Sequence, residues 1–154
     1  MPKREASMFK HILCAVDGSE HALKAAITAS ELAARLGSAL TFLTVTKELQ
    51  LTDEIRHYME IEHLTGSPQY VLDEMTDRVL SEAKEQAIEH GVPNARTEVR
   101  TGPAARTIVA YAERNGVDLI VLGSRGLGDI TGLLLGSVSH KVMSLAKCAC
   151  LMVR

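Results

Sequence analysis

The stretch Leu122-Gly-Ser-Arg-Gly-Leu-Gly-Asp-Ile-Thr-Gly-Leu-Leu-Leu-Gly-Ser137 is the segment around which this chain is organised. It follows the apolar run 118–122, which is typical of a buried strand, and it ends where a helical pattern opens. Glycines let a backbone approach a ligand closely, and the free N–H groups at a helix start attract anions. A connection this long between a strand and a helix is often functional. The stretch therefore predicts a phosphate-binding loop.

Strand and helix patterns alternate over the rest of the chain. Apolar or alternating runs predict strands at 11–16, 40–45, 95–100, 118–122 and 149–153, with 95–100 as an edge strand. Helical spacing predicts helices that begin after Asp17 or Ser19 as N-cap, near 67–90, after Pro103, and from 137 to about 147. Residues 47–66 are expected to form a solvated, partly helical connection. This alternation favours a parallel α/β sheet with helices on both faces, whose ligands bind at the carboxyl ends of the strands.

The glycine spacing is accompanied by two further motifs. The loop has the form Gly-x2-Gly-x9-Gly-Ser, the chain opens with Ile12-Leu-Cys-Ala-Val-Asp-Gly-Ser-Glu20, and the last helix is entered through Leu133-Leu-Leu-Gly-Ser-Val-Ser139. Together they resemble the universal stress protein family, in the subgroup that holds ATP, over residues 10–154. The resemblance implies a Rossmann-like, adenine nucleotide alpha hydrolase-like fold, with an open five-stranded parallel sheet of order 3-2-1-4-5. Cys148-Ala-Cys150 departs from the family's Cys-Pro-Val segment but leaves the loop untouched.

The resemblance also implies a nucleotide site. By likeness, Gly123 and Gly126 lie against the ribose and phosphates. The start of the last helix supplies backbone and hydroxyl donors to the phosphate chain, from Gly136, Ser137, Val138 and Ser139. Three apolar residues at strand ends, Ala15, Val45 and Leu122, either form the wall around the adenine or belong only to the hydrophobic core. Asp17 has two interpretations: its carboxylate binds ribose, adenine or a metal ion, or it only caps a helix. Arg125 either adds positive charge to the site or is simply solvated. The predicted site residues are Ala15, Asp17, Val45, Leu122, Gly123, Arg125, Gly126, Gly136, Ser137, Val138 and Ser139.

Composition bounds the remaining possibilities. The 154 residues suit one domain, 1–154, with residues 1–8 as a loose tail. The net charge is −2 and only 3% of the residues are aromatic, so the composition does not indicate a nucleic-acid-binding surface. It also gives no polybasic patch for binding a membrane. The sequence has neither a long apolar span nor a secretory h-region. Three cysteines without framework spacing indicate a reducing compartment, so a cytoplasmic protein is expected.

The catalytic inventory is thin. The chain has no Gly-x4-Gly-Lys-Ser/Thr segment, and therefore lacks the lysine that contacts β- and γ-phosphates in P-loop enzymes. The pair His57 and His63 does not have the spacing of a metalloprotease helix. Cys148 and Cys150 are expected to be buried thiols, because two ligands do not make a zinc site. No catalytic residue and no protein metal site are predicted.

Three functional hypotheses remain. The first is a cytoplasmic regulator or interaction module that responds to ATP or another adenylate, with Mg²⁺ and at most slow hydrolysis. The resemblance also implies a homodimer paired through the terminal strand, Cys150, Leu151, Met152 and Val153.

The alternative is a nucleotide-dependent hydrolase or transferase on the same fold, although the His-x-Gly-His and Ser-Gly-Gly-x-Asp-Ser signatures of such enzymes are absent. The third is a relative that has lost nucleotide affinity, against which the intact glycine spacing argues. A bulky residue at Gly123 or Gly136 is expected to abolish ligand binding and leave the fold intact.

Overall fold

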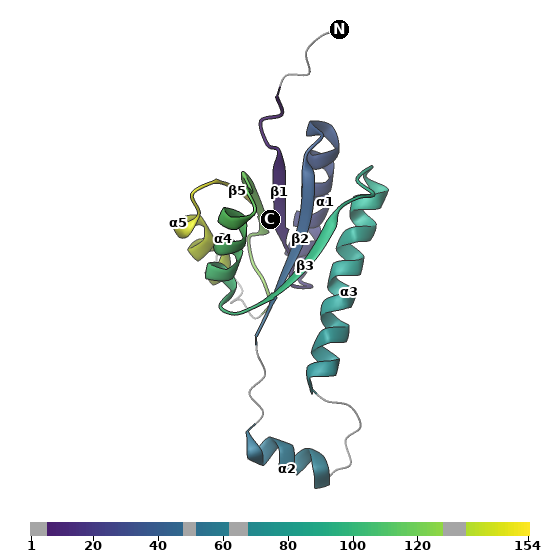
Figure 1. Ribbon diagram of the computed structural model, residues 1–154, viewed down its shortest axis with the longest axis vertical. Coiled ribbons are helices and arrows are strands. Elements are labelled where there is room, and N and C mark those ends of the chain that lie inside the picture. The colour runs from purple at the N-terminus through teal and green to yellow at the C-terminus, as the bar shows by residue number, and fades with distance from the viewer. Residues whose placement is uncertain (1–5, 48–51, 62–67, 128–134) are drawn as a thin grey trace.

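Strands and helices alternate along the chain, with two successive helices between the second and third strands (Figure 1). The computed structural model describes residues 6–47, 52–61, 68–127 and 135–154. The elements are β1 (His11–Ala15), α1 (Glu20–Leu36), β2 (Ala39–Thr46), α2 (Asp53–Ile61), α3 (Pro68–Glu89), β3 (Arg96–Thr101), α4 (Ala104–Arg114), β4 (Leu119–Gly123), α5 (Ser137–Leu145) and β5 (Ala149–Val153).

The strands form one parallel sheet in the order β3-β2-β1-β4-β5. This order and the parallel direction confirm the predicted fold class, and β3 lies at an edge as the alternating pattern indicated. β1 is central, and its Cys14 lies beside Phe42 of β2 and Val121 of β4. All three side chains are fully buried, which explains why the inner strands are near-continuous apolar runs.

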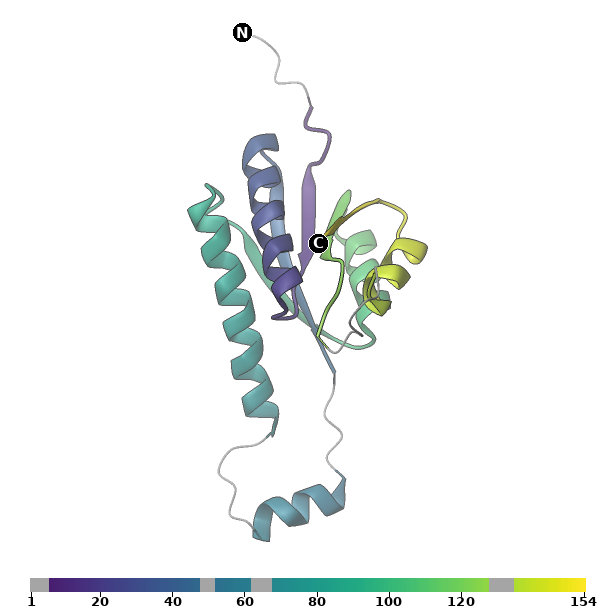
Figure 2. The same cartoon turned by 180° about the vertical axis from the view of Figure 1, so that it is seen from behind.

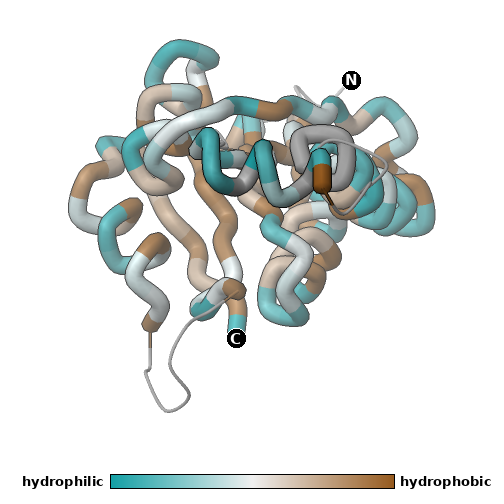
Figure 3. Tube along the Cα trace, turned by 90° about the horizontal axis from the view of Figure 1, so that it is seen from below, coloured by the Kyte–Doolittle hydropathy of each residue, from teal (hydrophilic) through white to brown (hydrophobic). Residues whose placement is uncertain are grey.

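Helices cover both faces of this sheet. α1 and α3 pack on one face, and α4 and α5 pack on the other, each pair over its own hydrophobic core (Figure 2). Hydrophobic residues gather in the central strands, while the outer surfaces of the helices are mostly hydrophilic (Figure 3). The buried face of α1 is almost all alanine, so its backbone lies close to the sheet. This close approach decides the role of one loop glycine, described below.

The ends of α1 follow the sequence signals. The Ser19 side chain accepts a hydrogen bond from the Ala22 N–H at 3.2 Å, so Ser19 and not Asp17 is the N-cap. Gly37 ends the helix in the left-handed conformation, with φ of 67°.

The short helix α5 departs from its predicted packing. Helical spacing places Val138, Val142 and Leu145 on an inward face. Val142 is fully buried, but Val138 and Leu145 are 39% and 47% exposed, so the prediction is wrong for these two residues. α5 has nine residues and buries only Ser139 and Val142, since it meets the sheet over little more than one turn. Val138 is thereby left at the edge of a cavity.

The connection between β2 and α3 is partly helical, as predicted, because it contains α2. Both ribbon views place α2 beyond the carboxyl ends of the strands and apart from the other helices. Its Tyr58 and Ile61 are 61% and 60% exposed. Among the described helices, none combines the length and the apolar character needed to cross a bilayer.

Candidate functional site

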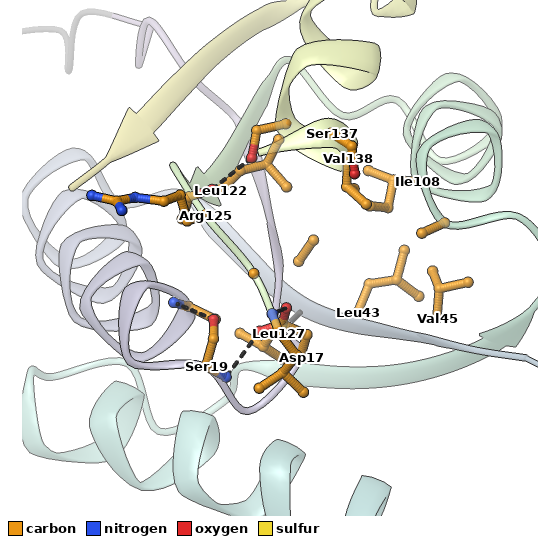
Figure 4. A pocket seen from close by; sticks show the side chains of 17 residues that line it. Asp17, Ser19, Leu43, Val45, Ile108, Leu122, Arg125, Leu127, Ser137 and Val138 are labelled. Carbon is orange, nitrogen blue, oxygen red and sulfur yellow. Dashed lines mark hydrogen bonds between the residues drawn. The ribbon is translucent and has the colours of Figure 1, made fainter. Parts of the chain in front are cut away.

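A cavity opens where the winding of the sheet reverses. The chain leaves β1 toward β2 and β3 on one side and later adds β4 and β5 on the other. Connections from the carboxyl ends of β1 and β4 therefore diverge and leave a crevice between them, which is where open α/β sheets bind ligands. The cavity has a volume of about 150 Å³ and lies at this edge (Figure 4).

The cavity brings together nearly all of the predicted site residues. Gly136 alone does not line it; it is buried directly before α5. Figure 4 shows an apolar wall of Leu43, Val45 and Ile108 facing the start of α5 across the cavity. The predicted residues in the lining are Ala15, Asp17, Val45, Leu122, Gly123, Arg125, Gly126, Ser137, Val138 and Ser139.

Asp17 connects the two loops that border the cavity. One carboxylate oxygen accepts a hydrogen bond from the Ser19 N–H at 2.9 Å, and the other accepts one from the Leu127 N–H at 3.1 Å. The first contact shapes the turn into α1, and the second holds the glycine loop against that turn. Asp17 is exposed and lines the cavity, so the carboxylate both positions the loop and presents its charge to the cavity.

The beginning of the glycine loop is held by protein contacts. A Cβ atom on Gly123 would lie 2.7 Å from the backbone carbonyl carbon of His21 and 2.9 Å from the amide nitrogen of Ala22. Gly123 is therefore needed where α1 crosses the end of β4. The expectation that a bulky residue here leaves the fold intact is wrong, because the atoms it would meet are helix backbone.

Ser124 joins three elements at the same point. Its N–H donates to the Val153 carbonyl at 2.7 Å, and its carbonyl accepts from the Gly136 N–H at 2.6 Å. Its hydroxyl shares a 3.1 Å hydrogen bond with Nδ1 of His21, and the residue is 2% exposed. Ser124 therefore fixes the distance between β5, α1 and the start of α5. The sequence carries no signal for this role, because a serine inside a glycine loop resembles any loop residue.

The start of α5 offers donors to the cavity. Gly136 is the N-cap and has no side chain to cap the helix, so the first amides of α5 have no intrahelical acceptor. Ser137 and Val138 are exposed at this point and line the cavity. Ser139 differs from them, since its buried hydroxyl donates to the Gly123 carbonyl at 2.7 Å. That hydroxyl braces the loop, so the predicted hydroxyl donation from Ser139 to a phosphate would require this bond to break.

Comparison with known proteins places the chain in a family. The model of the universal stress protein family matches residues 8–154. The chain belongs to the universal stress protein family. The universal stress protein YxiE of Bacillus subtilis is 38% identical over 157 aligned positions, which cover 96% of this chain and 100% of YxiE.

Solved universal stress proteins share the fold. The structure of UspA from Lactobacillus plantarum has a TM-score of 0.72 at 28% identity and covers 94% of this chain and 97% of that one. A universal stress protein solved in complex with cAMP has a TM-score of 0.68 at 25% identity, with 95% and 97% covered. Family membership and the five-stranded parallel sheet agree with the resemblance carried by the three motifs.

Arg125 does not face the apolar wall of this universal stress protein cavity. Figure 4 shows its side chain pointing away from Leu43, Val45 and Ile108. Its Nε atom is buried without a hydrogen-bond partner among the described residues. Arg125 is among the residues that line the cavity, but a charge contribution to a ligand would require another rotamer.

Several lining residues were not foreseen as site residues. Leu43 and Ile108 fall on patterns that predict core, and both are buried. Their side chains also form the cavity wall, a distinction that periodicity cannot make. Cys148 and Cys150 are free, half-buried thiols outside this site, and desolvation by burial raises the pKa of both. His63 and residues 128–134 of the loop lie outside the described residues.

Proposed function

We propose that this chain binds an adenine nucleotide, ATP in particular, in the cavity at the carboxyl ends of β1 and β4, and that it acts as a nucleotide-responsive regulator. The observation that carries the proposal is the pairing, in one cavity, of an apolar wall with an uncapped helix start. An apolar wall suits the base of a nucleotide, and the free amides of a helix start suit its phosphates. The cAMP complex of a relative at 25% identity supports an adenine nucleotide.

Each part of the cavity has a role in this proposal. Leu43, Val45 and Ile108 contact the base, while Asp17 at the mouth of β1 accepts from a ribose hydroxyl. The amides of Ser137 and Val138 donate to phosphate oxygens, where the partial positive charge of α5 favours an anion. Gly126 lets the loop backbone approach the phosphates closely.

Mg²⁺ fits this arrangement as an ion that arrives with the phosphates. It retains several waters and binds through one or two carboxylates together with substrate phosphates, where it neutralises their charge. Asp17 is a carboxylate in the lining. Among the described residues, no three His, Cys, Asp or Glu side chains form a cluster that could hold a metal ion.

Hydrolysis is expected to be slow at most. The contacts described act on the ground-state nucleotide, and binding that is equally strong in ground and transition states gives affinity and no turnover. An assay with Mg²⁺-ATP checks this, since turnover above about 1 s⁻¹ would indicate an enzyme and would favour the hydrolase or transferase alternative.

We also propose that the protein is a cytoplasmic homodimer paired through β5. The two sheet edges differ, because β3 presents Arg96, Glu98 and Arg100, whereas β5 presents a half-buried apolar run, Cys150–Val153. Charged side chains discourage strand pairing, and an apolar edge requires cover. Sedimentation should give twice the chain mass at micromolar concentration, and a monomer there would contradict the proposal.

The test of nucleotide binding uses the start of α5. In Ser137→Glu, a carboxylate lies among the helix amides, where it favours the helix but repels phosphates. Calorimetry should show ATP affinity reduced about tenfold or more, equivalent to about 1.4 kcal/mol, with thermal stability unchanged or raised. Ser137→Gln is the matched control and should retain most of the affinity. Wild-type protein that binds no adenylate at millimolar concentration, or equal affinity in the two variants, would overturn the proposal.

A further inference from the structure

A second groove lies on the face of α4 that points away from the nucleotide cavity. Ala104 and Ile108 of α4 line the nucleotide cavity, whereas Arg106, Ala110 and Arg114 follow a different face of the helix at intervals of four. With Arg100 and Thr101 from the end of β3, this second face encloses a groove of about 370 Å³. We call it the arginine groove.

Positive charge in the arginine groove is largely uncompensated. Arg106 and Arg114 are exposed, and no ion pair involves either of them among the described residues. Arg100 pairs with Glu98 at 2.8 Å, and Glu98 is not part of the lining. Within the part of the chain that the structure describes, no acidic residue lines the groove. Since the chain as a whole has a net charge of −2, this excess is local and does not follow from composition.

The side chains of the groove define the ligand chemistry. Guanidinium groups present paired N–H donors that match phosphate oxygens, and the lining of the groove also includes Thr101 and Thr107. The one aromatic ring, Tyr111, is buried, and the Arg100 guanidinium lies 5.2 Å from its centroid. A nucleic-acid base therefore has no exposed ring to stack on. Recognition in this groove falls on phosphate and not on a base.

The spacing of the arginines favours a chain of phosphates over a single one. Arg106 and Arg114 are two turns apart on α4, which corresponds to about 12 Å along the helix axis. A single phosphate would have to draw both side chains together to one point, whereas an extended anion contacts each arginine along the groove. We propose that the arginine groove binds an inorganic phosphate chain, at a site separate from the nucleotide cavity and on the other face of the same helix.

The test is calorimetric titration of the full chain with sodium tripolyphosphate at low salt. The variant R106Q/R114Q should lose affinity about tenfold or more, equivalent to about 1.4 kcal/mol. The control R35Q/R78Q removes the same charge from exposed arginines of α1 and α3 and should change affinity less than about twofold, the size of effect expected from distant screened charges. Melting curves should show that both variants remain folded, because all four side chains are exposed.

Two further measurements distinguish the arginine groove from the nucleotide cavity and a phosphate chain from a nucleic acid. Ser137→Glu, which repels phosphate at α5, should keep the tripolyphosphate site of the arginine groove, which R106Q/R114Q removes, so the arginine groove and the nucleotide site can fail independently. Loss of tripolyphosphate binding in Ser137→Glu, or equal loss in the two arginine double variants, would overturn the proposal, as would no binding by wild type. Tighter binding of a single-stranded oligonucleotide than of a phosphate chain of equal charge would also overturn it.

Discussion

The two ends of the glycine loop are chemically similar in sequence but differ in structure. At the β4 end, Gly123 meets α1 backbone, and all three polar groups of Ser124 have protein partners. At the α5 end, Gly136 caps the helix without a side chain, and Ser137 is exposed at the cavity. The first end therefore holds the framework together, and the second faces the cavity. Glycine and serine alone do not reveal which role each position has.

The largest effect that tests this comparison is expected from Gly123→Ala. The added Cβ meets the backbone of α1, which cannot yield locally. The whole helix must therefore shift on the sheet. Overpacking of this kind costs about 1–3 kcal/mol, and we expect the upper end, about 3 kcal/mol, in urea unfolding. Ser137→Ala at the other end is the matched control and should change stability by less than about 0.5 kcal/mol. Unchanged stability in Gly123→Ala would show that this glycine does not serve packing.

A smaller effect is expected from Ser139→Ala. The buried Ser139 hydroxyl donates to the Gly123 carbonyl, and alanine leaves that carbonyl without this partner. The loss of a buried hydrogen bond costs about 1–3 kcal/mol, and we expect about 2 kcal/mol in unfolding free energy. Ser139→Cys keeps a weak donor and should recover part of the loss. Equal stability in Ser139→Ala and Ser137→Ala would contradict the division between a serine that braces the loop and a serine that faces the cavity.

Much of the fold could be predicted from the sequence, because its signals are local. Apolar runs, caps and glycines predicted β1, α1 and the alternation that leads to a parallel sheet. The strand order was not local; it came from the resemblance, which three separate motifs carried. The inward face predicted for α5 was wrong at Val138 and Leu145, because a helical repeat indicates which residues share a face and not how much of that face meets the sheet.

The site was predictable as a location and less so as a set of roles. The sequence placed Asp17 and Gly123 at one crevice, and both line the cavity. It could not distinguish a glycine that makes room for α1 from one that makes room for a ligand, since that depends on which backbone crosses it. Ile108 was interpreted as core for a similar reason, because a wall residue and a core residue obey the same periodicity.

The smallest effect concerns Asp17, which joins the turn after β1 to the glycine loop. Asp17→Asn retains one side-chain carbonyl and loses the second acceptor, so either the Ser19 or the Leu127 N–H loses its partner. Because Asp17 is exposed, water can replace much of the bond, and we expect about 1 kcal/mol, at the middle of the range for one hydrogen bond. Hydrogen exchange at the Leu127 amide should quicken about fivefold, the rate factor that corresponds to this energy. Glu20→Gln is the control, since it changes charge in the same turn but pairs only with Lys24 on the surface of α1. Equal exchange at Leu127 in both variants would show that Asp17 does not hold the glycine loop, whose remaining contacts include those of Ser124 and Ser139.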